Sequence, residues 1–134
     1  MGKDRFAPHT RWLSDAPRAP CIYAAELVGL NGRMLKVGVG SNACGRMISL
    51  QSEVKRVYGA ALNRVAVFVK PTIKAAYEAE TKVLAALVPE AGPIDGRREF
   101  FEGITFKSVC AITETTAGQK SWFAKKATRR KQTA

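Results

Sequence analysis

The stretch CIYAAELVGLNGRMLKVGVGSNACGRM, residues 21–47, decides the expected fold. The runs at 20–27 and 33–39 have the composition of β-strands. They are joined around Asn31-Gly32, a dipeptide that favours tight hairpin turns. The stretch therefore predicts an antiparallel hairpin whose second strand leads directly into a helix.

Alternation along this hairpin brings two polar side chains to one face. Tyr23 in the first strand and Lys36 in the second are expected to meet there, because successive strand residues point to opposite faces. Gly38 shares the face of Lys36, and Gly40 follows it. Glycines at a strand end indicate a simple bend or a close approach by a ligand or another backbone. Spacing alone leaves both explanations open.

Two helices and a third strand are expected after the hairpin. The first helix, expected at 43–57, has Ser41 or Asn42 as its N-cap. Arg46 lies at the border of its apolar stripe, where most arginines simply extend to solvent. The rest of the chain is expected to form a strand at 62–69, a helix at 73–88 capped by Thr72 and stopped by Pro89, a loop with a short extended piece at 92–103, and an element of undefined type at 104–114.

Glu80 is the sharpest anomaly in the second helix. A helical wheel places it at the centre of an apolar face formed by Ile73, Ala76, Tyr77, Val83, Leu84 and Leu87. A buried, unpaired carboxylate is energetically costly, so Glu80 should have a cationic partner. That partner is either an internal arginine or lysine, or a divalent metal such as Mg²⁺, which prefers oxygen ligands.

Length and composition predict one domain with distinct ends. The chain has 134 residues, of which 46% are hydrophobic. We expect a flexible leader at 1–19, a folded domain at 20–116 and a basic arm at 117–134. The arm carries six positive charges, at Lys120, Lys125, Lys126, Arg129, Arg130 and Lys131. Its two aromatic residues, Trp122 and Phe123, either stack on bases or pack on the domain.

Charge and cysteine content narrow the function classes. The net charge of +11 favours a polyanionic partner, most often nucleic acid, over a charge that serves only solubility. Three cysteines without a CxxC pair, and no signal peptide, fit a reducing cytosol. The single histidine, His9, argues against a structural zinc site. Because no apolar run approaches about 20 residues, no membrane span is expected.

Four features in this order resemble the GIY-YIG nuclease superfamily: CIY at 21–23, KVG at 36–38, Arg46 on the next helix and Glu80 on the one after it. EAETKVLAAL at 78–87, followed by REFF at 98–101, is similar to the phage-associated branch, which carries Lys-Ile-Gly as its second motif. The chain departs from the common pattern at Cys21, Lys36 and Leu50, which stand where many members have Gly, Tyr, and Tyr or His. No asparagine follows Glu80 at the spacing some members show, and Glu99 is the nearest polar candidate.

The resemblance implies a small α/β sandwich with a central three-stranded antiparallel sheet flanked by helices. It implies a cytoplasmic, bacterial or phage-encoded endonuclease that hydrolyses DNA phosphodiester bonds with Mg²⁺ or Mn²⁺. Glu80 would hold the metal, and Tyr23 would orient or deprotonate the attacking water. A free phenol has a pKa of about 10, so Lys36 would supply the neighbouring cation. Arg46 would bind the phosphate and stabilise the transition state.

The DNA contacts implied by this reading extend beyond the catalytic residues. Backbone at Gly38, Gly40 and Ser41 would approach the substrate, and the basic arm, with Lys125, Lys126, Arg129 and Arg130, would hold phosphates without reading sequence. Two alternatives remain from the residues alone. One is a binding module of the same fold that does not cleave, and the other is a ribosome- or RNA-associated basic protein, which does not account for Glu80.

Overall fold

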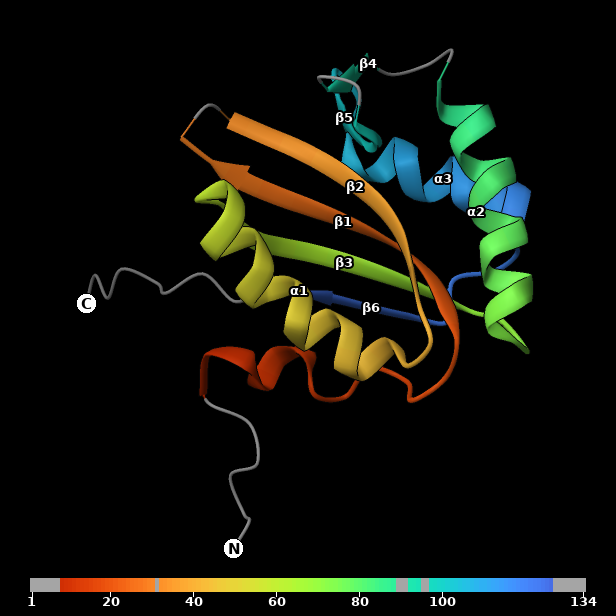
Figure 1. Ribbon diagram of the computed structural model, residues 1–134, viewed down its shortest axis with the longest axis horizontal. Helices are drawn as coiled ribbons and strands as arrows, with labels where there is room; N and C mark the ends of the chain where they lie inside the picture. The colour runs from red at the N-terminus through yellow and green to blue at the C-terminus, as the bar shows by residue number, and fades with distance from the viewer. Residues whose placement is uncertain (1–7, 31, 89–91, 95–96, 127–134) are drawn as a thin grey trace, which may run out of the picture.

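The hairpin of the quoted stretch forms the middle of the sheet. The computed structural model describes residues 8–30, 32–88, 92–94 and 97–126 (Figure 1). Strand β1 (Cys21–Gly29) pairs antiparallel with β2 (Gly32–Gly40), and Gly29 lies opposite Gly32. The expected hairpin is confirmed, and its turn begins at Leu30, where the side chain is fully exposed.

The sheet is larger than the expected three strands. Strand β3 (Ala61–Val69), which was predicted as a third strand at 62–69, pairs with the other edge of β1. Three short strands extend the sheet on both sides: β4 (Gly92–Ile94), β5 (Arg97–Glu102) and β6 (Trp122–Lys125). The order is β4-β5-β2-β1-β3-β6, and every pairing is antiparallel. The three-stranded prediction was wrong because it left β2 and β3 as bare edges, which folded proteins commonly cover.

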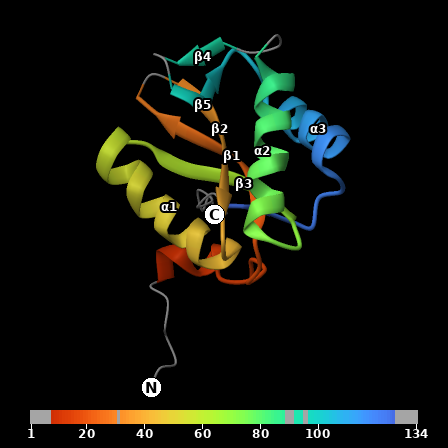
Figure 2. The same ribbon diagram turned by 45° about the vertical axis from the view of Figure 1, so that its right-hand side comes forward.

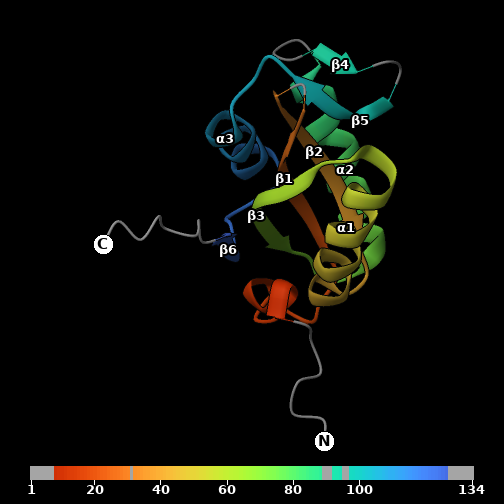
Figure 3. The same ribbon diagram turned by 90° about the vertical axis from the view of Figure 1, so that its left-hand side faces the viewer.

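Three α-helices cover the two faces of the sheet: α1 (Ala43–Tyr58), α2 (Ile73–Leu87) and α3 (Phe106–Ala117). The core on one face includes α1 together with Tyr23, and the core on the other includes α2 and α3 together with Ile22. Figure 3 shows α1 and α3 on opposite sides of β1 and β3. The class is therefore mixed α/β, with helices on both faces, as expected.

The helix ends follow the predicted capping. The Asn42 side chain accepts a hydrogen bond from the Gly45 backbone N–H at 3.2 Å, so Asn42 is the N-cap of α1. Thr72 caps α2 in the same way through the Ala75 N–H at 3.0 Å. The ambiguous segment at 104–114 is helical from Phe106 onward, and Thr105 caps α3 by accepting a hydrogen bond from the N–H of Ser108. Side-chain caps of this kind satisfy N–H groups that have no partner inside the helix.

Both ends of the expected domain extend further than the sequence suggested. A 3₁₀ helix, η1 (Pro8–Leu13), precedes β1, and Leu13 and Ala16 are buried in the α1-side core. The expected leader at 1–19 is thus packed over part of its length. Strand β6 likewise lies inside the expected arm at 117–134, and residues 127–134 lie outside the described residues. Within the described part of the chain, no helix is long and apolar enough to cross a membrane.

Candidate nucleic-acid active site

Tyr23 lies at the centre of the sheet on the face covered by α1. It is fully buried and pairs with Gly38 across the hairpin. A Cβ atom added at Gly38 would lie 2.6 Å from Tyr23 Cζ, closer than real Cβ contacts come. The phenol ring therefore occupies the space above Gly38. Packing of a side chain against Gly38 is neither of the two explanations that spacing left open, which were a bend and a close approach by a ligand or another backbone.

Lys36 meets Tyr23 on this face, as the alternation predicted. Its side chain is buried, and its Nζ lies 5.5 Å from the centroid of the Tyr23 ring and 5.1 Å from that of Phe100. Both distances fall within the range of cation–π attraction. Phe100, on β5, in turn contacts Tyr58 at the end of α1. The ammonium is therefore held between two aromatic rings, one of which is the candidate catalytic phenol.

Arg46 approaches Tyr23 from the first turns of α1. Its guanidinium carbon lies 5.7 Å from the Tyr23 ring centroid, and its NH1 group donates to the Glu53 carboxylate at 3.1 Å. Burial works to lower the pKa of Arg46, yet attraction to the Tyr23 oxygen and the hydrogen bond to Glu53 raise it above its ordinary value. A Cβ added at Gly40 would lie 2.8 Å from Arg46 Cβ. Gly40 thus makes room for this arginine, as Gly38 does for the tyrosine.

Glu80 is carried by the helix on the other side of β2. Figure 2 shows α1 and α2 flanking β2. In the described part of the chain, β5 pairs with β2 only at Leu35 and Lys36, so the edge of β2 from 37 to 40 has no strand partner there. The candidate residues of β1, β2 and α1 therefore lie beside a free strand edge, with α2 on its far side.

The position of Glu80 on α2 corrects the helical-wheel prediction. The buried residues of α2 are Ala76, Ala79, Val83 and Leu87, whereas Tyr77 is 57% exposed and Glu80 is half-buried. Glu80 is thus at the border of the buried face and not at its centre. The wheel was wrong because it counted Tyr77 and Ile73 as core residues, and both are exposed.

The elements that pack against α2 show on which side of its buried face Glu80 lies. Ala86 lines a shallow pocket with residues of α3, so it marks the α3 side of α2. Glu80 lies about 120° from Ala86 around the helix, with the buried residues between the two directions. α2 packs on β2 and β1, and α3 packs on β1 and β3. Glu80 therefore lies on the border of α2 that is turned from α3 and next to the β2 edge.

The donor set suits a metal that is shared with a substrate. Among the described residues, no three His, Cys, Asp or Glu side chains cluster to hold a metal ion. Mg²⁺ commonly retains waters and binds through one or two carboxylates plus substrate phosphate. A single half-buried carboxylate on α2 could take part in that mode, and it does not form a closed protein-only metal site.

The remaining predicted DNA-binding residues are spread over the molecule. Ser41 is exposed in the turn between β2 and α1, next to Gly40. Lys125 and Lys126 are exposed at the end of β6, beyond β3 from the β2 edge. Arg129 and Arg130 lie outside the described residues. The structure therefore groups Tyr23, Lys36, Arg46, Gly38 and Gly40, with Ser41 adjacent, and sets the two lysines of the arm apart.

Sequence reasoning missed an ion cluster on the opposite face of β1. Glu26 is buried and accepts hydrogen bonds from Arg64 at 2.8 and 3.0 Å, from Asn63 at 2.7 Å and from Arg33 at 3.0 Å. The hydrogen bond from Arg64 outweighs the effect of burial, and the donors together lower the pKa of Glu26 to about 2. A carboxylate within an apolar strand was the available signal. Glu53 was also signalled, because it lies two helical turns after Arg46 on the same face of the predicted helix, whereas the contact of Phe100 with Lys36 had no comparable signal.

No protein-family model, curated protein or solved structure matches this chain.

Proposed function

We propose that the protein is a metal-dependent endonuclease that hydrolyses DNA phosphodiester bonds beside the free edge of β2. The observation that carries the proposal is the meeting of a buried phenol with two cations, Lys36 and Arg46, over glycines that make room for them. A hydrophobic core has no need of such a group. An anionic substrate that must be attacked by water makes use of all three side chains.

Tyr23 and its two cations would handle the attacking water. The attraction that raises the pKa of Arg46 acts equally on its partner, so it stabilises the negatively charged form of the Tyr23 oxygen. Lys36 adds a second positive charge over the same ring. Tyr23 thereby orients a water molecule toward phosphorus and accepts its proton, while Lys36 remains protonated.

Arg46 would bind the phosphate itself. A guanidinium has five N–H donors; here NH1 donates to Glu53 at 3.1 Å and to Ser49 Oγ at 3.5 Å, and the guanidinium also hydrogen-bonds Tyr23. The remaining donors suit bidentate contact with two phosphate oxygens. Because charge on these oxygens increases as the bond to water forms, this contact strengthens in the transition state.

Glu80 would hold the divalent metal together with the substrate. When bound, Mg²⁺ or Mn²⁺ would offset negative charge that develops on the leaving oxygen. Position supports the assignment, because Glu80 lies on the border of α2 next to the β2 edge. The net charge of +11 supplies the general attraction for DNA.

The test is cleavage of labelled single- and double-stranded DNA by Glu80→Gln, in Mg²⁺ and in EDTA. We expect wild-type cleavage in Mg²⁺ only, and a loss of at least about 10²-fold in the variant, because Gln conserves shape but removes the charge that binds the cation. Glu78→Gln, on the exposed side of the same helix, is the matched control and should cleave like wild type.

Two results would contradict this proposal. Undiminished metal-dependent cleavage by Glu80→Gln would remove Glu80 from the site. Absence of cleavage by wild type with every divalent metal, combined with tight DNA binding, would favour the non-cleaving module of the same fold.

A further inference from the structure

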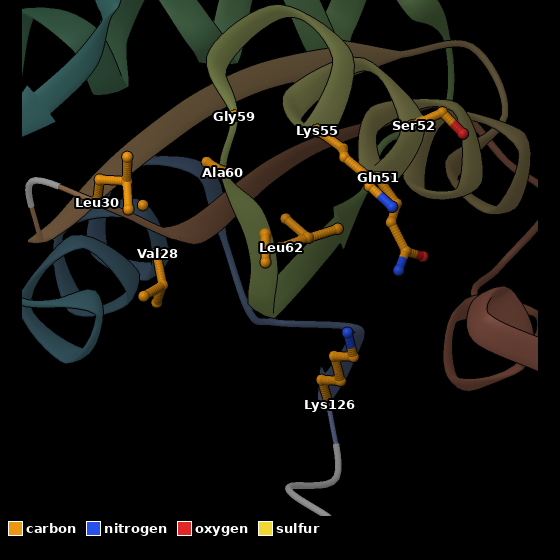
Figure 4. A pocket seen from close by; sticks show the side chains of 11 residues that line it. Val28, Leu30, Gln51, Ser52, Lys55, Gly59, Ala60, Leu62 and Lys126 are labelled. Atoms are coloured by element: carbon orange, nitrogen blue, oxygen red, sulfur yellow. The ribbon is translucent and has the colours of Figure 1, made fainter.

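A pocket lies on the other side of α1 from the candidate site. It has a volume of about 850 Å³ and is formed by the C-terminal half of α1, the tip of the β1–β2 hairpin, the start of β3 and the end of β6 (Figure 4). Arg46 and Lys55, which mark the site and the pocket, are nine residues apart on α1. This separation corresponds to about 13 Å of helix rise and places them on opposite sides of the helix.

The pocket has an apolar wall and a polar rim. Figure 4 shows Leu30 and Val28 on one side, with Leu62 lying between Lys55 and Lys126. The amide of Gln51 and the hydroxyl of Ser52 complete the rim. The described residues that line the pocket include two lysines and no carboxylate. The occupant that complements this lining has an anionic group and an apolar body.

Leu30 is the most informative wall residue. Its side chain is 102% exposed at the tip of a hairpin, so it contributes nothing to the core. Turn positions usually carry Gly, Asn, Asp or Ser, for which a tight turn has a physical use. A leucine here instead leaves apolar surface exposed, next to a lysine-bearing rim.

Charge distinguishes the possible occupants. Residues 127–134 carry Arg129, Arg130 and Lys131 and no acid, so the two lysines of the pocket would repel them. A second copy of the chain, with its own net charge of +11, is also disfavoured. A nucleotide has both required parts, because its base is flat and largely apolar on its faces and its phosphate is anionic.

We propose that this pocket binds one unstacked nucleotide of a single-stranded segment of nucleic acid. The base lies against Leu30 and Leu62, with its edge toward Gln51 and Ser52, and a phosphate lies between Lys55 and Lys126. The inference deepens the proposed function, on which it rests for the choice of nucleic acid. It implies a substrate that has an unpaired strand on the far side of α1 from the cleavage site.

The experiment measures binding of a labelled 12-nucleotide single strand and of the corresponding duplex in EDTA, so that no cleavage occurs. Ala61→Trp fills the pocket from an exposed lining position, Leu30→Ser removes apolar surface without opening a cavity, and Lys55→Met removes one rim charge. Lys107→Met, an exposed lysine on α3 at the opposite face of the sheet, is the matched control.

We expect single-strand affinity to fall about tenfold in Ala61→Trp and several-fold in Leu30→Ser and Lys55→Met, the scale of one lost base contact or phosphate contact. Lys107→Met should remain within about twofold of wild type, and duplex binding should change less than single-strand binding. A deoxynucleoside monophosphate should compete with the single strand more effectively than inorganic phosphate does at the same concentration.

Two outcomes would contradict the proposal that this pocket binds a nucleotide. One is unchanged single-strand binding in Leu30→Ser and Lys55→Met, whose positions are exposed and whose folding is therefore not at risk. The other is inorganic phosphate competing as well as the nucleotide, which would show a simple anion site. Absence of cleavage by the wild type with every divalent metal, together with intact single-strand binding in EDTA, would contradict the nuclease proposal and leave the nucleotide pocket standing.

Discussion

Tyr23 and Glu26 lie three residues apart on β1, and each carries a buried polar group, yet the sheet uses them differently. Glu26 faces the α2–α3 side, where three side chains donate four hydrogen bonds to its two oxygens. Tyr23 faces α1, where its ring has two cations within 6 Å of its centroid and a glycine beneath it.

The difference shows how a structural polar cluster can be separated from a candidate site. At Glu26 the bulge in the β1–β3 pairing makes Asn63 an extra residue, and its side chain turns toward the carboxylate. Donors and acceptor are matched, as stability requires of a buried charge. At Tyr23, glycines of low intrinsic strand propensity make room for a phenol and an arginine stem. That arrangement places two cations around a phenol, in space that the glycines leave open.

The sharpest separation should come from Tyr23→Phe. The substitution keeps the ring and its packing but removes the oxygen that we assign to the water. We expect cleavage to fall by at least about 10²-fold, the low end for loss of a general base. DNA affinity in Ca²⁺ and the melting temperature should change little. Single-turnover cleavage across pH provides the measurement, and activity indifferent to this change would refute the assigned role.

Glu26→Gln should give the opposite pattern, with a loss of stability and intact chemistry. The folded-state pKa of about 2 is below the ordinary value of 4.5, so the carboxylate stabilises the fold at neutral pH by up to about 3 kcal/mol. The donors stabilise only the ionised carboxylate. Their contribution to the free energy of unfolding is therefore complete above about pH 4.5 and disappears as the pH falls toward 2.

Urea unfolding of wild type and Glu26→Gln at several pH values tests this expectation. The difference in unfolding free energy should be large at pH 7 and shrink below pH 4.5, whereas Glu78→Gln should match wild type. A difference that stays constant between pH 7 and pH 3 would show that the hydrogen bonds to Glu26 do not depend on its charge.

The close contact between Gly38 and Tyr23 predicts that substitutions at the two positions have coupled effects on the free energy of unfolding. In Gly38→Ala the new Cβ would meet Tyr23 Cζ at 2.6 Å, so ring or strand must shift. We expect a destabilisation of about 1–3 kcal/mol, typical of overpacking. The same change in a Tyr23→Leu background should cost much less, because the obstructing ring is gone.

Gly45→Ala is the control for this pair. Gly45 is in α1, and an added Cβ there would come no closer than 3.9 Å to the nearest atom. Alanine should therefore be neutral or stabilising by up to about 1 kcal/mol, the usual gain over glycine in a helix. Equal costs for Gly38→Ala in both Tyr23 backgrounds, measured by thermal or urea unfolding, would show that the glycine serves something other than the ring.

Most of the central fold could be predicted from the sequence. The hairpin, the third strand, both helix caps and the shared face of Tyr23 and Lys36 follow from local rules of alternation and capping. Only a short extended piece was expected at 92–103, and the pairing of β4, β5 and β6 with the sheet could not be predicted, because segments of three to six residues without strong periodicity become strands only when a neighbouring edge supplies hydrogen bonds. Leu13 is buried for a similarly non-local reason, since η1 packs on α1.

The candidate site was predictable in its residues more than in its geometry. Arg46 was expected at the border of the core, and it is there. Glu80 was expected at the centre of a buried face, yet apolar side chains such as Tyr77 remained on the surface, and no helical wheel reports which apolar residues a sheet covers. The support given by Phe100 depends on long-range packing that spacing does not encode, whereas Glu53 lies seven residues after Arg46 on the same face of α1, a position that helical spacing does encode.

Glu53→Gln should give the smallest effect and the most specific one. Glu53 Oε1 lies 3.1 Å from Arg46 NH1, and both side chains are partly exposed, so the pair contributes at most about 1 kcal/mol to stability. Its carboxylate both orients the guanidinium and competes with a phosphate for it. Removing the charge should therefore tighten DNA binding about two- to threefold in Ca²⁺, because one local repulsion of the phosphate is gone.

The cleavage rate of Glu53→Gln at saturating DNA should fall several-fold although its DNA affinity rises, since a less firmly held guanidinium is less well placed for the transition state. A purely structural ion pair would instead lower both quantities or neither. Single-turnover rates and binding constants for Glu53→Gln, with Glu53→Asp to test reach, measure this split. If both the cleavage rate and the binding constant are unchanged, Arg46 does not contact the scissile phosphate. Tyr23 would then have no phosphate-binding neighbour, and the proposed mechanism would lose the group that stabilises its transition state.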